Sequence, residues 1–169
     1  MLVYLCIVHP KCKITTAIGQ WETYRTVFKT AYGYKTEIPT ELQGACVTHE
    51  VDVIAEKDGK VVGSVSGYIP PQEPDTFFLW QVAADSSARG TGLGTAMIHF
   101  ILTSAACKPV RFLNTTITED NEASWGLFKG IAKKLGAELN SEVMFDKERH
   151  FTGEHDSEML VRIGPFSLN

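Results

Sequence analysis

Residues 89–97 read RGTGLGTAM, and they place glycine at the alternate positions Gly90, Gly92 and Gly94. They follow the apolar run FFLWQVAA at 77–84 after a short connection, and apolar residues recur at helical spacing from Leu93 onward. Glycine lets a backbone approach a ligand closely, and a helix start presents unpaired N–H groups at its positive end. The stretch therefore predicts a strand, a tight turn and a helix whose first amides hold an anion, best a pyrophosphate.

Two better-known glycine motifs do not fit this stretch. A dinucleotide-binding fingerprint needs glycine at the first, third and sixth places, and the sixth place counted from Gly90 is Thr95. A P-loop ends in Gly-Lys-Ser/Thr, but no lysine lies between Lys60 and Lys108. The remaining alternative is a turn that only reverses the chain, which needs one glycine rather than three.

Composition limits the class of protein. The chain has 169 residues, 44% of them hydrophobic, which predicts one compact domain spanning residues 1–169. Its formal net charge of −4 disfavours nucleic acid and favours a cationic or zwitterionic small molecule as partner. The opening MLVYLCIV reads as a first strand and is too short to span a bilayer, so no membrane partner is expected.

The cysteines indicate a reducing environment. Cys6, Cys12, Cys46 and Cys107 have neither the paired spacing of a zinc site nor the density of a disulfide scaffold. We therefore expect a cytoplasmic protein without a metal site. Cys107 has no evident histidine partner in the sequence, so a covalent acyl-cysteine intermediate is disfavoured.

The order of predicted elements gives an α/β (α+β) fold with a mixed central sheet flanked by helices. A helix is expected where apolar residues recur between Ala17 and Ala31, followed by a loop over 32–45. The pair Asp58-Gly59 predicts a hairpin within 51–70, and 76–84 adds a third strand. Then come a helix from Gly92 to about Cys107, a strand over 110–118, a helix from Asn121 to Gly136, and strands over 142–148 and 158–164.

With these elements in place, the string Arg-x-x-Gly-x-Gly at Arg89–Gly94 resembles the acetyl-CoA motif of the GNAT acyltransferases. The element order is likewise similar to the GNAT acyl-CoA N-acyltransferase fold. The resemblance implies acetyl-CoA as co-substrate. It implies that main-chain amides hold the pyrophosphate, that Val82 and Ala84 pair with the pantetheine arm, and that the second helix faces the thiol end. The implied cofactor-binding residues are Val82, Ala84, Arg89, Gly90, Thr91, Gly92, Leu93, Gly94, Thr95, Asn121 and Ser124.

Longer strings resemble one branch of that family. FLWQVAADSSARGTGLG, TTITEDNEASWGLF and GEHDSEMLVRIGP are similar to the L-2,4-diaminobutyrate acetyltransferases of ectoine biosynthesis over roughly residues 53–165. This implies transfer of an acetyl group to the γ-amine of L-2,4-diaminobutyrate, giving N-γ-acetyl-diaminobutyrate for compatible-solute synthesis and osmoprotection, by a homodimer. Residues 1–50 diverge, since TAYGYKTEIP at 30–39 does not reproduce the family's polar Asp-x-Asn-Ser-x-Tyr segment.

The chemistry of amine acetylation singles out the tail of the chain. An alkyl ammonium has a pKa near ~10 and must lose a proton before it attacks a thioester. Glu158 and His155 are the catalytic candidates, with Asp156 between them as a substrate-binding candidate. Glu158 is also a candidate anchor for a substrate ammonium. The alternative is that this acidic cluster only caps and solvates a hairpin.

By resemblance, Trp80 and Gln81 line the acceptor pocket, although an apolar strand tryptophan is also ordinary core. Many GNAT enzymes carry a tyrosine, as general acid for the departing thiolate, at the position that Phe128 occupies here. Without it, water or another donor meets the thiolate, or the thiolate leaves as an anion. Arg162, Lys35 and main-chain donors are open candidates for the substrate carboxylate.

Two other functions fit the sequence less closely. One is acetylation of another small diamine or a polyamine, which the divergence of residues 1–50 favours. The other is a catalytically silent acyl-CoA-binding module that lacks an acceptor pocket.

Overall fold

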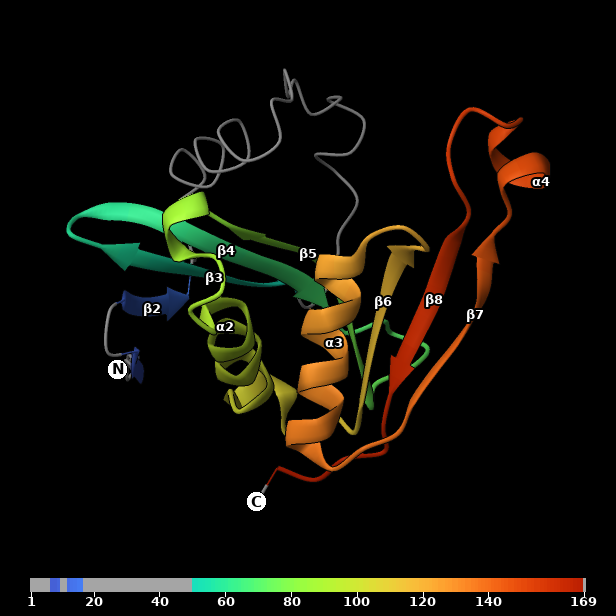
Figure 1. Ribbon diagram of the computed structural model, residues 1–169. Helices are drawn as coiled ribbons and strands as arrows, with labels where there is room; N and C mark the ends of the chain where they lie inside the picture. The colour runs from blue at the N-terminus through green and yellow to red at the C-terminus, as the bar shows by residue number, and fades with distance from the viewer. Residues whose placement is uncertain (1–6, 10–11, 17–49, 169) are drawn as a thin grey trace, which may run out of the picture. The chain divides into compact units, whose positions relative to one another are not determined.

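The computed structural model describes residues 7–9, 12–16 and 50–168 (Figure 1). It divides into two compact units, which are treated separately below. Unit 1 comprises Met1–Tyr68 and Gln81–Lys108, and unit 2 comprises Ile69–Trp80 and Pro109–Asn169. Strand β5, Thr76–Ala84, begins in unit 2 and ends in unit 1.

Unit 1 is built on antiparallel strands that follow one another in chain order. They are β1 (Ile7–His9), β2 (Cys12–Thr16), β3 (Glu50–Lys57) and β4 (Lys60–Tyr68), with the end of β5 beyond β4. Asp58 and Gly59 both have positive φ, 52° and 73°, which is the type I′ geometry of a two-residue hairpin. The predicted hairpin is therefore confirmed.

Helix α2, Leu93–Leu102, covers one face of the β3–β4 pair. A Cβ added to Gly63 would lie 3.0 Å from the Met97 methyl carbon and 3.1 Å from Leu93 Cδ2, so β4 carries glycine where the helix approaches most closely. The helix ends earlier than predicted because Ser104, with φ −69° and ψ 160°, is extended rather than helical. The rest of the predicted helix is a 3₁₀ turn, η3, over Ala105–Cys107.

Unit 2 contains a mixed sheet in the order β5-β6-β8-β7. β6 (Phe112–Thr118) runs parallel to β5 and antiparallel to β8 (Glu158–Ile163), which pairs with β7 (Leu139–Phe145). Helix α3, Glu122–Leu135, lies across one face of this sheet in Figure 1. Asn121 caps its start and Gly136, with φ 61°, ends it, as predicted. The parallel and antiparallel pairs confirm the predicted mixed α/β sheet.

The fold differs from the sequence-based expectation at two places. The strand predicted over 142–148 stops at Phe145, because the Asp146 carboxylate accepts from the backbone N–H groups of Glu148 and Arg149 at 3.0 and 2.9 Å. That cap starts a short helix, α4, over Lys147–Phe151. Strand β2 was not predicted at all. The helix expected between Ala17 and Ala31 and the loop over 32–45 lie outside the described residues.

Cys107 is 2% exposed, and burial raises the pKa of its thiol. A protonated, shielded thiol fits the expectation that this cysteine takes no part in catalysis. Within the described ranges, every helix is too short or too polar to cross a bilayer.

Candidate functional site

The predicted anion-binding turn begins where β5 ends in unit 1. The Asp85 carboxylate accepts from the Ser87 N–H at 2.8 Å and the Ser87 hydroxyl at 2.6 Å, and these bonds lower its pKa. They close the 3₁₀ turn η2, Ser86–Ala88. Arg89 Nε donates back to the Ala84 carbonyl at 3.3 Å, so the turn is tied to the end of the strand.

Two glycines bring the chain from this turn into α2. Gly90 and Gly92 have φ values of 70° and 81°, and an added Cβ would meet nothing within 4 Å at either position. The backbone conformation, not lack of space, therefore requires glycine here. Gly92 is the N-cap residue of α2 and offers no side-chain cap. The predicted strand, turn and helix start are confirmed.

The first helical hydrogen bond of α2 runs from the Ala96 N–H to the Gly92 carbonyl, 3.0 Å away. The amides of Leu93, Gly94 and Thr95 precede it and have no acceptor within the helix. They point outward at the positive end of the helix dipole, as a pyrophosphate site requires. Pyrophosphate binding itself stays a prediction. Unit 1 also holds Gln81, Val82 and Ala84, all half-buried on β5, and Thr91, whose hydroxyl donates to the Ala88 carbonyl at 2.7 Å.

In unit 2, the start of α3 is fixed to the end of β6. Asn121 Oδ1 accepts from the Ser124 N–H at 3.1 Å, and the Trp125 indole N–H donates to the Thr118 carbonyl at 3.1 Å. Asn121 is thus a helix cap, and its role toward the pantetheine arm stays a prediction. Phe128 is 2% exposed and belongs to the core beneath this helix.

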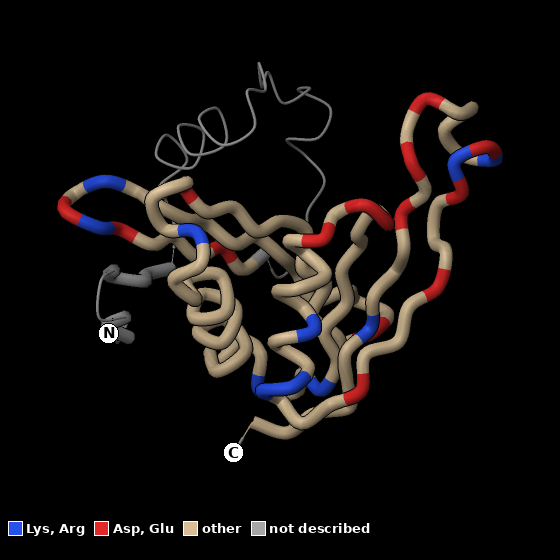
Figure 2. Tube along the Cα trace, viewed as in Figure 1, with Lys and Arg blue, Asp and Glu red and all other residues tan. Residues whose placement is uncertain are grey.

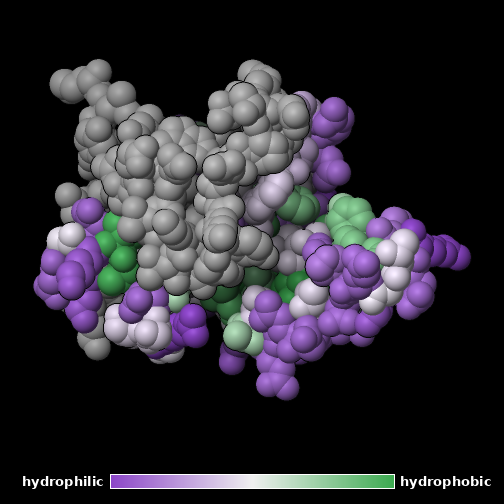
Figure 3. All heavy atoms as spheres, turned by 90° about the horizontal axis from the view of Figure 1, so that it is seen from above, coloured by the Kyte–Doolittle hydropathy of each residue, from purple (hydrophilic) through white to green (hydrophobic). Residues whose placement is uncertain are grey.

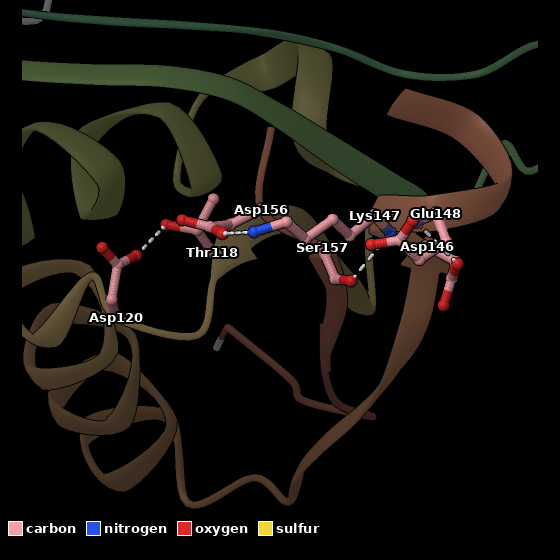
Figure 4. Close-up of polar contacts among 7 residues, drawn as sticks. All are labelled: Thr118, Asp120, Asp146, Lys147, Glu148, Asp156 and Ser157. Atoms are coloured by element: carbon pink, nitrogen blue, oxygen red, sulfur yellow. Dashed lines mark hydrogen bonds and ion pairs between the residues drawn. The ribbon is translucent and has the colours of Figure 1, made fainter. Parts of the chain in front are cut away.

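A network of polar contacts holds the tail loop that carries His155 and Asp156 and leads into Glu158, the first residue of β8 (Figure 4). Lys147 Nζ forms an ion pair with Asp156 at 2.9 Å, and the Lys147 N–H donates to Ser157 Oγ at 2.9 Å. The His155 ring packs edge-on against Phe151, with centroids 5.7 Å apart. Asp156 and His155 therefore have structural contacts of their own, whereas no hydrogen bond or ion pair of the Glu158 carboxylate occurs within the described part of the chain.

The sheet of unit 2 brings Glu158 to the start of α3. Glu158 is the register partner of Thr118, and Thr118 Oγ1 donates to Asp120 at 2.7 Å, one residue before the cap Asn121. Figure 2 shows that acidic residues gather at this end of unit 2. Such an end attracts a cationic acceptor. The gathered acidic residues are Glu119, Asp120, Glu122 and Glu158.

Arg162, a candidate partner of the substrate carboxylate, is already engaged elsewhere in unit 2. Its guanidinium stacks on Phe112 at 4.0 Å and donates to Asn114 at 3.3 Å and to Glu73 at 3.4 Å. The structure does not bring it to Glu158, which lies four residues away on the same strand. Lys35, the other charged candidate, lies outside the described residues.

Trp80 is 71% exposed, so the alternative that it is plain core is wrong. Figure 3 shows hydrophobic patches among the hydrophilic surface. The indole ring of Trp80 is therefore accessible to a ligand, and its place in the acceptor pocket stays a prediction. The other large hydrophobic side chains exposed in the described residues are Val143, Met144 and Phe145, on β7.

Comparison with known proteins bears directly on this site. The model of the acetyltransferase (GNAT) family matches residues 19–132. The L-2,4-diaminobutyric acid acetyltransferase of Methylotuvimicrobium alcaliphilum is 51% identical over 117 residues, which cover 69% of this chain and 68% of that protein. The corresponding enzyme of Halomonas elongata is 44% identical over 139 residues, 82% of this chain and 69% of that protein. This chain belongs to the GNAT diaminobutyrate acetyltransferases.

A solved structure of the same family resembles this chain. The diaminobutyrate acetyltransferase EctA of Paenibacillus lautus, in complex with L-2,4-diaminobutyric acid and coenzyme A, superimposes with a TM-score of 0.65. It is 38% identical, and the match covers 70% of this chain and 72% of that one. In a GNAT acetyltransferase the glycine turn at the start of α2 is the expected coenzyme site, which agrees with the amide geometry of unit 1.

Sequence reasoning missed the residues that shape the tail of this acetyltransferase. Asp146, Lys147 and Ser157 fix the loop that carries the acidic candidates, and the string Asp-Lys-Glu-Arg after an apolar strand was a readable helix-start signal. Asp52, inside the β-rich stretch of unit 1, was also passed over. A lone carboxylate in an apolar strand is itself a signal. Among the described residues, His, Cys, Asp and Glu side chains form no group of three or more that could hold a metal ion.

Proposed function

We propose that this protein transfers the acetyl group of acetyl-CoA to the γ-amine of L-2,4-diaminobutyrate. The observation that carries the proposal is the 38% identity to a relative solved with both L-2,4-diaminobutyric acid and coenzyme A. The product is N-γ-acetyl-diaminobutyrate, a step of ectoine biosynthesis. We place the reaction in the cytoplasm and assign it to a homodimer, as the resemblance implies.

The main chain of unit 1 binds the coenzyme in this proposal. The outward amides of Leu93, Gly94 and Thr95 support binding of the pyrophosphate, with the preceding turn from Arg89 closing around it. The β5 backbone at Val82 and Ala84 pairs with the pantetheine arm. Because these contacts use main-chain groups, they depend on the two positive-φ glycines rather than on side-chain chemistry.

The reacting amine loses its proton at the acidic end of unit 2. Glu158 accepts this proton, directly or through one water, because its carboxylate is half-buried and has no partner among the described residues. The neutral nitrogen then attacks the thioester carbonyl. As the C–N bond forms and the C–S bond breaks, the nitrogen releases its second proton to water. His155 and Asp156 flank the acceptor in this proposal, with Asp156 oriented by Lys147.

The leaving group needs no dedicated acid. Phe128 is buried and cannot donate a proton. An alkyl thiol has a pKa near ~8.5, so the CoA thiolate leaves as an anion and takes up a proton from water afterwards.

Turnover with defined substrates tests the proposal. Incubation with acetyl-CoA and L-2,4-diaminobutyrate should release free thiol, and NMR of the product should place the acetyl group on the γ-nitrogen. Preference for putrescine, spermidine or ornithine would assign the protein to a different amine instead. Saturable CoA binding without turnover on any of these amines would identify a silent acyl-CoA-binding module.

A further inference from the structure

Asp52 is a carboxylate in the interior of strand β3, in unit 1. Its register partner on β4 is Ser66, and the neighbouring pair on the same face is Ile54 with Ser64. Side chains alternate between the faces of a sheet. Gly63 faces α2, so Ser64 and Ser66 lie on the opposite face, and Asp52 lies there with them. Asp52 and two serines therefore share the face of the sheet that α2 does not cover.

This face is polar although it is shielded from water. Ser64 and Ser66 are 2% and 8% exposed, and Ile54, opposite Ser64 on β3, is 1% exposed. Asp52 Oδ1 is buried and accepts no hydrogen bond. In the described part of the chain, ion pairs link only Lys147 to Asp156 and Arg162 to Glu73, so no described cation neutralises Asp52. A buried carboxylate oxygen without a donor is costly and needs a cationic ligand or a proton.

The position of Asp52 in the sheet can be related to Gln81, the candidate acceptor-pocket residue on β5 within unit 1. β4 and β5 are adjacent and joined by seven residues, too few for a parallel crossover, so they run antiparallel. The Asp85 N–H donates to the Val62 carbonyl at 2.8 Å. Counted along both strands from that hydrogen bond, Ser66 on β4 lies nearly opposite Gln81 on β5. Asp52, one strand further, lies two strand spacings, about 10 Å, from β5.

We propose that the Asp52 carboxylate binds the α-ammonium group of the amino-acid acceptor, with Ser66 beside it as a second polar contact. This inference rests on the proposed function and extends it, because it names the group that selects an amino acid with two amines. Asp52 is a specificity-determining residue in this view. Its place on a paired strand holds the carboxylate in one position, as an anchor requires.

The charge of the acceptor's two nitrogens favours the α-ammonium, rather than the reacting γ-amine, as the group that Asp52 binds. A carboxylate in contact with an ammonium stabilises its protonated form, which would oppose attack by the γ-nitrogen. The α-ammonium stays charged throughout the reaction, so its contact with Asp52 is equally strong before and during attack. Such a contact affects binding of the acceptor and leaves the chemical step unchanged.

The test compares two acceptors that differ only in the α-ammonium. L-2,4-diaminobutyrate carries it, and 4-aminobutyrate lacks it while keeping the reacting amine and the carboxylate. In the Asp52→Asn variant we expect KM for diaminobutyrate to rise about 10- to 100-fold, as for loss of a hydrogen bond to a charged group, with little change in kcat. Activity with 4-aminobutyrate, assayed at high concentration, should not change.

Glu56→Gln is the matched control, because Glu56 lies on the same strand, four residues from Asp52. It removes the same charge from unit 1, and neither acceptor should respond. Calorimetric CoA binding checks that each variant is folded. If Asp52→Asn fails that check, Asp52→Ser takes its place, since serine already occupies the opposite position on β4.

Three results would overturn the inference. Equal losses of kcat with both acceptors would mean that Asp52 acts on the reacting amine. Unchanged KM for diaminobutyrate would mean that Asp52 does not touch the acceptor. If the parent protein fails to acetylate diaminobutyrate, the proposed function is wrong and this inference fails with it. If the parent protein is active and Asp52→Asn behaves like it, only the assignment of Asp52 is wrong.

Discussion

Glu158 lies directly opposite Thr118 in the antiparallel β6–β8 ladder. Thr118 ends β6, and the turn that follows leads through Asp120 to Asn121, the cap of α3. Two segments that are forty residues apart in the chain, each identified as a candidate from its own motif, therefore meet at one end of unit 2. The ladder, rather than the loop, sets the position of Glu158.

Glu158→Gln tests the proposed proton acceptor. We expect kcat to fall about 10²- to 10⁴-fold, the usual contribution of general-base catalysis, with CoA affinity unchanged. Steady-state kinetics and CoA calorimetry measure the two effects. Glu142→Gln is the control, because Glu142 is exposed on the adjacent strand β7. If only KM for the acceptor rises, Glu158 is an ammonium anchor; if nothing changes, it has no role in turnover.

Gly92→Ala tests the turn at the start of α2. The φ value of 81° is unfavourable for alanine, so the unfolding free energy should fall by about 1 kcal/mol. The Kd for CoA should rise about tenfold as the first amides of α2 move. Gly126→Ala in α3 is the matched control. Gly126 has open space around it within a helix, so alanine there should stabilise the protein by about 0.5–1 kcal/mol. Unaltered CoA affinity in Gly92→Ala would exclude the amide site.

Trp80→Ala separates a ligand contact from a core contact. Because Trp80 is 71% exposed, its loss should change the unfolding free energy by less than about 1 kcal/mol while raising KM for the acceptor about tenfold. Phe77, on the same strand, is 0% exposed, and Phe77→Ala should lose about 3–5 kcal/mol. Chemical denaturation and acceptor titrations measure these changes. An unchanged KM in Trp80→Ala would remove Trp80 from the acceptor site.

Neutralising either member of the Lys147–Asp156 pair tests how Asp156 acts. The side chains are 44% and 61% exposed, so solvent screens the ion pair and it contributes little to stability. If Asp156 binds the acceptor, Asp156→Asn should raise KM for diaminobutyrate by more than Lys147→Met does. Equal effects of both variants, with no further effect when they are combined, would show that Asp156 only positions the loop.

The sequence was sufficient where a local rule decides the structure. The glycine turn before α2, the Asp58-Gly59 hairpin and the Asn121 cap were all predicted from residue type and spacing. It was insufficient where the decision depends on tertiary pairing. The meeting of Glu158 with Thr118 follows from strand order, in which β8 lies between β6 and β7 although β7 comes first in the chain. Spacing along the chain carries no information about that insertion.

Short capped elements and unusually placed polar residues are a second kind of feature that the sequence alone did not settle. The strand predicted through residue 148 failed because one carboxylate, Asp146, offers the backbone a helical alternative that outweighs the apolar pattern of β7. The exposure of Trp80 was left open by the sequence, because the same strand pattern serves a core and a binding surface. Asp52 could be read as unusual from its apolar neighbours, but its unpartnered oxygen is visible only in the fold.

Asp52 should make stability depend on pH in a direction opposite to that of a salt-bridged carboxylate. Burial raises its pKa above 3.8, the value it has when exposed, and the Ser66 hydroxyl acts in the opposite sense with a smaller effect. The folded state therefore holds this proton to higher pH than the unfolded state does. The contribution of this raised pKa to the free energy of unfolding is fully present below about pH 3.8, and it is lost as the pH rises through the folded-state pKa. At neutral pH the ionised Asp52 is then a net cost.

We accordingly expect Asp52→Asn to be more stable than the parent protein at pH 7, by about 1 kcal/mol, the low end of the cost of an unpaired buried polar group. The difference should shrink as the pH falls toward 4, and denaturant unfolding of both proteins across this range measures it. Saturating diaminobutyrate should reduce the difference at pH 7, because a bound ammonium stabilises only the parent carboxylate. A constant difference at all pH values would mean that the pKa of Asp52 is the same in the folded and unfolded states, contrary to the raised value.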